Sequence, residues 1–72
     1  MEDKKLYIVE GLGELIMTSE QRNTLDRILT AASVHYISSF ERGEHVEVCR
    51  KWINELTDMQ VQLWKQQEEY ER

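Results

Sequence analysis

The chain has 72 residues, of which 32% are charged and 40% are hydrophobic, and its formal net charge at pH 7 is −5. It contains no proline, three glycines and a single cysteine, so an internal disulfide is excluded. In a chain this short, the apolar area that folding can bury only about offsets the conformational entropy that folding removes. The composition therefore predicts one small, mainly α-helical domain that is completed by association with a second copy or with another protein.

Residues 1–18 contain two β-prone runs around a glycine-containing turn. The first run, 6–10, is rich in β-branched and aromatic residues, and the second run, 14–18, follows the sequence Gly-Leu-Gly at 11–13. Two such runs separated by three residues are typical of a β-hairpin, with Gly13 at the positive φ of a bulge turn. The second run could instead begin a helix, because Glu, Leu and Met favour helices. A two-stranded ribbon is marginal alone and has to pack on another element.

The first helix is predicted over residues 19–42. Thr18 is a suitable N-cap, and Gln21 three residues later completes a capping box. Val34 and Ile37 point away from the main apolar face of this helix and indicate a second apolar surface. Gly43 is predicted to end the helix in the left-handed conformation. The main apolar face repeats at three- and four-residue steps and consists of Leu25, Ile28, Leu29, Ala32, Tyr36 and Phe40.

The second helix is predicted over residues 44–72, with Glu44 and Glu47 in its first turn. A tight turn at Gly43 makes the two helices antiparallel neighbours. The first helix is shorter and covers only part of the apolar stripe of the second, so we expect dimerisation to complete a helical bundle. This stripe has a coiled-coil-like spacing and consists of Val46, Cys49, Trp52, Ile53, Leu56, Met59, Leu63, Trp64 and Tyr70.

Aromatic and apolar side chains that one neighbouring helix cannot cover are the candidate contact residues. Trp and Tyr dominate the binding energy of many protein interfaces. Trp52, which is near the turn, is expected in the core of the protein itself, whereas Trp64 and Tyr70 are expected to contact a second subunit or a partner. The set predicted for self-association or partner binding is Trp52, Met59, Leu63, Trp64, Tyr70, Val34 and Ile37.

Glutamates around the predicted turn define a candidate acidic binding face, which consists of Glu41, Glu44 and Glu47. Acidic surfaces of this kind speed and steer association with basic partners. The same glutamates could simply keep a small helical protein soluble, because basic residues are interleaved with them. Both interpretations remain open at the level of the sequence.

The residue types that catalyse reactions or bind metals have the wrong number or spacing here. His45 and Cys49 are one helical turn apart, but a structural zinc site needs four ligands and the sequence has no second His/Cys cluster. Cys49 also falls on the apolar stripe, where a thiol is usually inert. The Gly-Leu-Gly at 11–13 lacks the Gly-Lys that a phosphate-binding loop requires. We therefore expect no enzymatic activity, no metal and no cofactor.

Dispersed basic residues and a net charge of −5 disfavour nucleic-acid binding. No apolar run approaches the roughly 18 residues that a membrane span needs, and a cytoplasmic location is expected. The predicted function is a non-enzymatic protein–protein interaction or regulatory module, a small acidic homodimer or higher oligomer that binds itself or an unidentified protein. The alternative is an acidic, DNA-mimic-like inhibitor of a host or nucleic-acid-handling protein, of the kind that phages and mobile elements encode.

Overall fold

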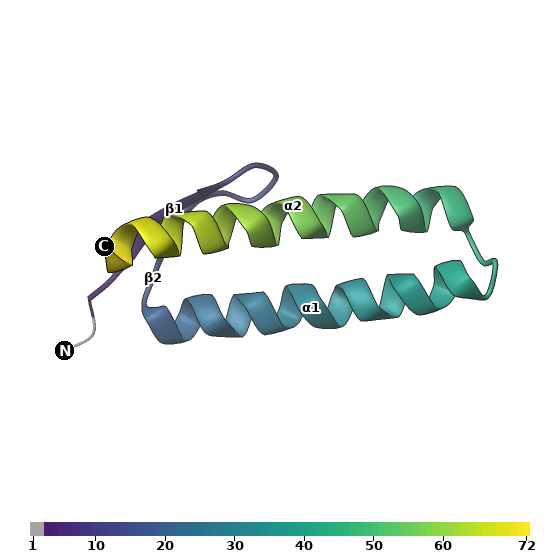
Figure 1. Cartoon of the computed structure of the whole chain (residues 1–72), viewed down its shortest axis with the longest axis horizontal. Coiled ribbons are helices and arrows are strands. Elements are labelled where there is room, and N and C mark those ends of the chain that lie inside the picture. Colours follow the sequence, from purple (N-terminus) through teal and green to yellow (C-terminus); the bar gives the residue numbers. More distant parts are fainter. Residues whose placement is uncertain (1–2) are drawn as a thin grey trace.

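The computed structural model describes residues 3–72, so the first two residues of the predicted N-terminal region lie outside the described range. The elements are β1 (Lys5–Val9), β2 (Gly13–Met17), α1 (Ser19–Glu41) and α2 (Val46–Glu71). The helices form a long antiparallel hairpin, and the strands form a ribbon against the end of the hairpin where α2 finishes (Figure 1). The molecule is a rod of 46 × 19 × 19 Å. The predicted mainly helical architecture with an N-terminal β-hairpin is confirmed.

The two strands pair antiparallel, from Lys5 opposite Met17 to Val9 opposite Gly13. Gly13 has a φ of +86°, which an L-residue with a side chain rarely adopts, so glycine here favours the turn. The alternative in which residues 14–18 begin a helix is therefore wrong. Side chains alternate across the ribbon, so that Tyr7 and Val9 are buried towards the helices.

The start of α1 follows the predicted capping box. The Thr18 side chain accepts a hydrogen bond from the Gln21 backbone N–H at 3.1 Å, and the Gln21 side chain accepts one from the Thr18 N–H at 2.9 Å. These two bonds satisfy donors that the first helical turn leaves without intrahelical partners. The chain consequently turns sharply from β2 into α1 at a single residue.

The turn between the helices is slightly longer than the sequence indicated, because α1 ends at Glu41 and α2 begins only at Val46. Gly43 has the predicted left-handed backbone, with a φ of +78°. His45 also has a positive φ, +45°, and it precedes the first residue of α2, Val46. Glu44 therefore lies in the turn and not in the first turn of α2, whereas Glu47 does lie there. Glycine signalled the first of these two left-handed residues, but no local feature of His45 signalled the second.

The hydrophobic core lies where the ribbon covers the helical hairpin. Its buried members come from three elements: Tyr7 and Val9 from β1, Leu29 from α1 and Leu63 from α2. Cys49 is also buried, close to the other end of the hairpin. Among residues 3–72, no helix is long and apolar enough to cross a lipid bilayer. Partly buried side chains surround this core, namely Leu15, Met17, Leu25, Leu56 and Met59.

Candidate interaction surfaces

The outer edge of β1 is bound by side chains of α2. The carboxamide of Gln66 accepts a hydrogen bond from the Ile8 N–H at 2.7 Å and donates one to the Ile8 carbonyl at 2.7 Å. Gln62 accepts a bond from the Glu10 N–H at 2.8 Å, and the Tyr70 hydroxyl donates to the carbonyl of Leu6. Three helix side chains thus supply the bonds that a third strand would otherwise make.

This contact is possible because two spacings agree. Gln62, Gln66 and Tyr70 are four residues apart on α2, which is a rise of about 6 Å per step. The backbone groups that they bind belong to Leu6 and Ile8 in β1 and to Glu10 directly after it, and these are two residues apart, which is about 6.6 Å per step. Gln62 and Gln66 were not among the predicted contact residues, because no short-range pattern in the sequence indicates that this part of α2 lies beside β1.

Tyr70 also packs on the ribbon through its ring. Its ring centroid lies 5.6 Å from that of Tyr7 in an edge-on arrangement, and the Lys5 ammonium lies 5.2 Å from the same Tyr70 centroid. Burial raises the pKa of the Tyr7 phenol, and the nearby positive charge of Arg22 partly opposes this. Tyr70, which was predicted to contact a partner, is therefore occupied in part by its own chain.

Trp64 lies on a different flank of the helical hairpin. Its indole N–H donates to the Asp26 carboxylate at 3.1 Å. Gln60 donates to the same carboxylate oxygen at 3.1 Å and to the Thr30 hydroxyl at 2.8 Å. The Trp64 side chain is 49% exposed, so this polar cluster orients the indole while half of its surface remains open to solvent.

Trp52 was predicted to be buried in the core, and this prediction is wrong. The Trp52 ring contacts Tyr36 with a centroid separation of 4.9 Å, yet 42% of the residue is exposed. The ribbon covers the hairpin only at the opposite end, so nothing among the described residues closes over this indole. A hollow of about 200 Å³ adjoins it, lined by Tyr36, Trp52, Glu55, Leu56 and Met59.

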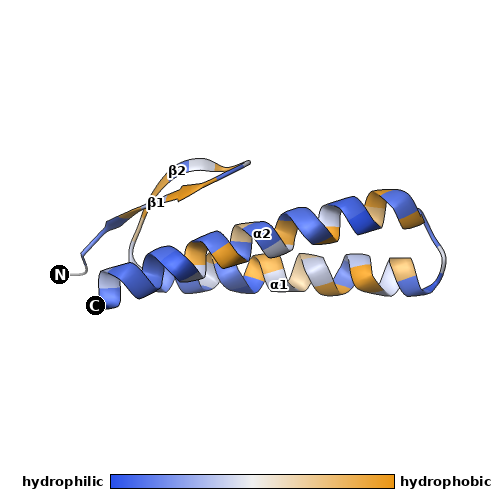
Figure 2. Cartoon of the chain, turned by 45° about the horizontal axis from the view of Figure 1, so that its top comes forward, coloured by the Kyte–Doolittle hydropathy of each residue, from blue (hydrophilic) through white to orange (hydrophobic). Residues whose placement is uncertain are grey.

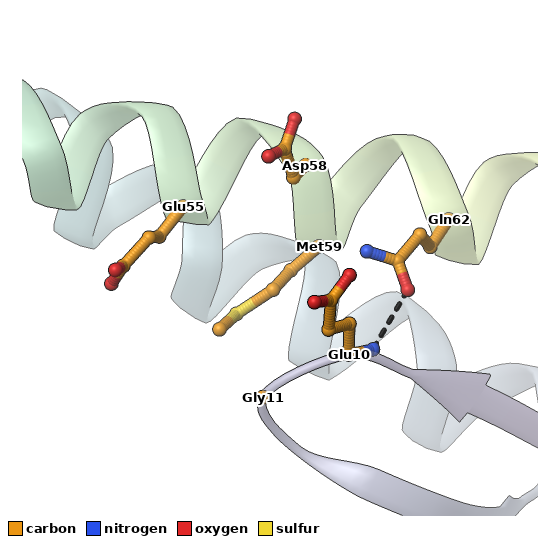
Figure 3. A pocket seen from close by; sticks show the side chains of 6 residues that line it. All are labelled: Glu10, Gly11, Glu55, Asp58, Met59 and Gln62. Atoms are coloured by element: carbon orange, nitrogen blue, oxygen red, sulfur yellow. Dashed lines mark hydrogen bonds between the residues drawn. The ribbon is translucent and has the colours of Figure 1, made fainter.

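A second hollow, of about 370 Å³, opens beside the tip of the ribbon (Figure 3). The Glu10 side chain reaches from the ribbon turn towards α2 and lies next to Gln62 and Met59 (Figure 3). A Cβ at Gly11 would lie only 2.9 Å from the Met59 methyl, which shows how closely the ribbon tip approaches α2. No basic residue is in the lining, which consists of Glu10, Gly11, Glu55, Asp58, Met59 and Gln62.

The predicted contact set does not form one surface. Leu63 is completely buried in the core and has no area to offer a partner in this fold. Met59 lies between the two hollows, whereas Trp64 lies beside Asp26 on another flank. Val34 and Ile37 are exposed on α1, at 58% and 41%. Helical periodicity places Val34 on the face of α1 opposite Leu25 and Tyr36.

The predicted acidic face is exposed but partly neutralised. Glu41, Glu44 and Glu47 all lie on the surface around the turn. The Arg42 guanidinium lies 3.3 Å from a Glu44 carboxylate oxygen, and the pKa of Glu44 is lowered by the hydrogen bond and by the charge of Arg42. The carboxylates around the hollow at the ribbon tip, which has no basic residue in its lining, are therefore less neutralised by positive charge than those of the predicted acidic face.

His45 and Cys49, the pair that could have contributed to a metal site, differ in their exposure to solvent. Cys49 is buried, and its thiol donates a hydrogen bond of 3.6 Å to the Glu44 carbonyl, whereas His45 is exposed in the turn. Over residues 3–72, no group of three or more His, Cys, Asp or Glu side chains is arranged to hold a metal ion.

Comparison with protein-family models, with curated proteins and with solved structures found no match to this sequence.

Proposed function

We propose that the chain is a non-enzymatic protein–protein interaction module that self-associates as a homodimer or higher oligomer. The observation that carries this proposal is the distribution of large apolar side chains. In the described part of the chain, five hydrophobic residues are buried and eleven large ones are exposed, among them both tryptophans. Single exposed aliphatic side chains are common on the surfaces of monomeric proteins. Half-exposed tryptophans and a continuous apolar face of a ribbon are instead typical of surfaces that contact another protein.

The chemistry of the hollows supports a binding role over a catalytic one. The hollow at the ribbon tip offers carboxylates, an amide and a thioether, and its neighbour offers two aromatic rings, a leucine and the same thioether. Neither lining places a nucleophile beside a base and an orienting group, which covalent catalysis requires. Aromatic and thioether surfaces instead favour contact with another protein.

Sedimentation equilibrium of the purified chain tests this proposal. We expect the mass to rise with concentration in the micromolar range from 8.6 kDa towards at least twice that value. A mass that stays at the monomer value at every concentration would overturn self-association.

A second candidate, binding of a basic protein by an acidic surface, is favoured by the hollow at the ribbon tip. Glu10, Glu55 and Asp58 surround it, and no lysine or arginine lines it. A cationic side chain entering there would relieve the mutual repulsion of these carboxylates. Titration with a lysine-rich and leucine-rich peptide tests this candidate. Binding should weaken with salt and in the triple amide variant Glu10→Gln, Glu55→Gln, Asp58→Asn, but not in Glu68→Gln; equal affinity throughout would refute it.

A further inference from the structure

The two edges of the ribbon are not equivalent. Backbone groups of Leu6 and Ile8 point outwards from β1 and bind side chains of α2. Their partners across the ribbon are Ile16 and Glu14, whose N–H and C=O groups consequently point outwards from β2, on the side away from β1. Among residues 3–72, no hydrogen bond reaches these four β2 groups. Figure 2 shows β1 between β2 and α2, and no element beyond β2.

The side chains beside this free edge are apolar. Ile16 is 67% exposed, more than any other large hydrophobic residue of the described chain. Leu6 lies directly opposite Ile16, and Ile8 lies one pair further along, so all three side chains share the outer face of the ribbon. An exposed strand edge with apolar side chains is a template for pairing with another strand.

We propose that β2 pairs antiparallel with β2 of a second copy, so that the two ribbons form one four-stranded sheet centred on Leu15. This inference rests on the proposed self-association and names the surface that produces it. In the centred register, Glu14 of one copy lies opposite Ile16 of the other. The N–H and C=O groups of both residues are then satisfied in both copies, with four hydrogen bonds across the interface.

The charge of Glu14 and the hydrogen bonds that Thr18 already makes at the start of α1 favour the centred register over the two adjacent registers. A shift that places Glu14 opposite Glu14 of the second copy brings two carboxylates together, which is unfavourable. A shift that places Ile16 opposite Ile16 brings Glu14 opposite Thr18. The Thr18 N–H is already bound by Gln21, and its carbonyl already accepts from the Arg22 N–H. Only the centred register satisfies every outward group and separates the like charges.

A second copy fits this edge better than an unrelated strand because the pairing is self-complementary. Two identical antiparallel strands are related by a two-fold axis, so one contact surface serves both chains. In the resulting sheet the outermost strands are the two β1 strands. Their outer edges are already bound by Gln62, Gln66 and Tyr70. Assembly through strand edges therefore stops at two copies instead of continuing into a fibre.

Amide hydrogen exchange of the full chain at increasing concentration tests this pairing. The Glu14 and Ile16 amides should exchange freely in dilute protein and become protected by at least about tenfold as the dimer forms. The Tyr7 and Leu15 amides, which bond within the ribbon, should be protected at every concentration. Self-association without concentration-dependent protection of Glu14 and Ile16 would overturn the strand pairing but not the proposed function. A chain that stays monomeric would overturn both.

Substitution at Ile16 gives an independent measurement. Ile16→Pro removes an N–H that makes no bond within the ribbon, and proline is tolerated on strand edges of this kind. We expect this variant to sediment as a monomer with unchanged helicity, whereas Ile16→Val, which keeps the N–H, stays dimeric. Trp64→Ala, on the other flank, should also stay dimeric. A dimeric Ile16→Pro together with a monomeric Trp64→Ala would overturn the proposal and assign the interface to the tryptophan flank.

Discussion

The carboxamide of Gln66 binds both the N–H and the carbonyl of Ile8, each at 2.7 Å, across 58 residues of sequence. An amide side chain in this position imitates the backbone of a neighbouring strand. It attaches the ribbon to α2 and at the same time removes one of the two strand edges that the ribbon would expose. The ribbon is thus held to the helices by polar bonds at its edge as well as by the Tyr7 and Val9 side chains beneath it.

Replacement of Gln66 by alanine should destabilise the fold by about 1–2 kcal/mol, because it removes the side chain's two hydrogen bonds to Ile8 and its one bond to the Gln62 carbonyl, and it leaves both Ile8 groups without a protein partner. Urea unfolding followed by circular dichroism measures the change in the free energy of unfolding. Gln67→Ala is the matched control, since the one side-chain hydrogen bond that Gln67 makes within residues 3–72 is to Glu71, one turn along the same helix. Equal stabilities of the two variants would show that the contact to Ile8 contributes nothing.

Arg22 offers an opportunity to stabilise the protein. The residue is only 6% exposed, and one terminal nitrogen of its guanidinium donates to the Asn23 side-chain carbonyl. Its Nε has no hydrogen-bond partner, and within residues 3–72 no carboxylate lies at ion-pair distance from it. Burial of a charge without an ion-pair partner is unfavourable, so Arg22→Met should raise the free energy of unfolding by about 1 kcal/mol. The exposed Arg27→Met should leave it nearly unchanged. A loss of stability in Arg22→Met would mean that the guanidinium makes a favourable contact.

Thr18→Ala should lower the free energy of unfolding by about 1 kcal/mol, because Thr18 caps α1 and fixes the angle between β2 and the helix. Thr24 provides the control. Among the described residues, its hydroxyl donates to the Glu20 carbonyl within α1 and to no other group, and a bond of this kind adds little to helix stability. Thermal unfolding of Thr18→Ala and Thr24→Ala should therefore separate the two variants. Identical midpoints would argue against the capping box as a determinant of the fold.

Stability should fall as the pH rises above about 10. Burial raises the pKa of Tyr7 above its ordinary value of 10.0, so the unfolded chain loses this proton before the folded chain does. The contribution is fully present below pH 10.0 and is lost as the pH rises towards the folded pKa. In Tyr7→Phe the decline in unfolding free energy over this range should be shallower. Tyr36→Phe is the control, and equal slopes in both variants would contradict the assignment to Tyr7.

Local signals in the sequence were sufficient for the elements of the fold. The capping box at Thr18 and Gln21, the positive φ of Gly13 and the left-handed Gly43 each depend on a few neighbouring residues, and all three are confirmed. The second left-handed residue, His45, could not be predicted, since this conformation is rare for any residue other than glycine, although histidine is one of the residues enriched in it. The later start of α2 follows from this residue.

The candidate surfaces were harder to predict because they depend on where the ribbon lies. Periodicity placed Trp52 and Leu63 on the same stripe of α2, but the ribbon covers only the half of the hairpin that contains Leu63. Trp52 is consequently half exposed. The roles of Gln62 and Gln66 likewise depend on a contact between β1 and the far end of α2, which no short-range pattern specifies.

The pairing of two β2 strands is tested most directly by an isotope-filtered nuclear Overhauser experiment on a mixture of labelled and unlabelled chains. In the centred register, Leu15 faces Leu15 of the second copy in a non-hydrogen-bonded pair, with α-carbons about 4.5 Å apart. The account predicts a strong intermolecular signal between the two Leu15 α-protons. Intermolecular signals from the Trp64 flank without any from Leu15 would contradict it.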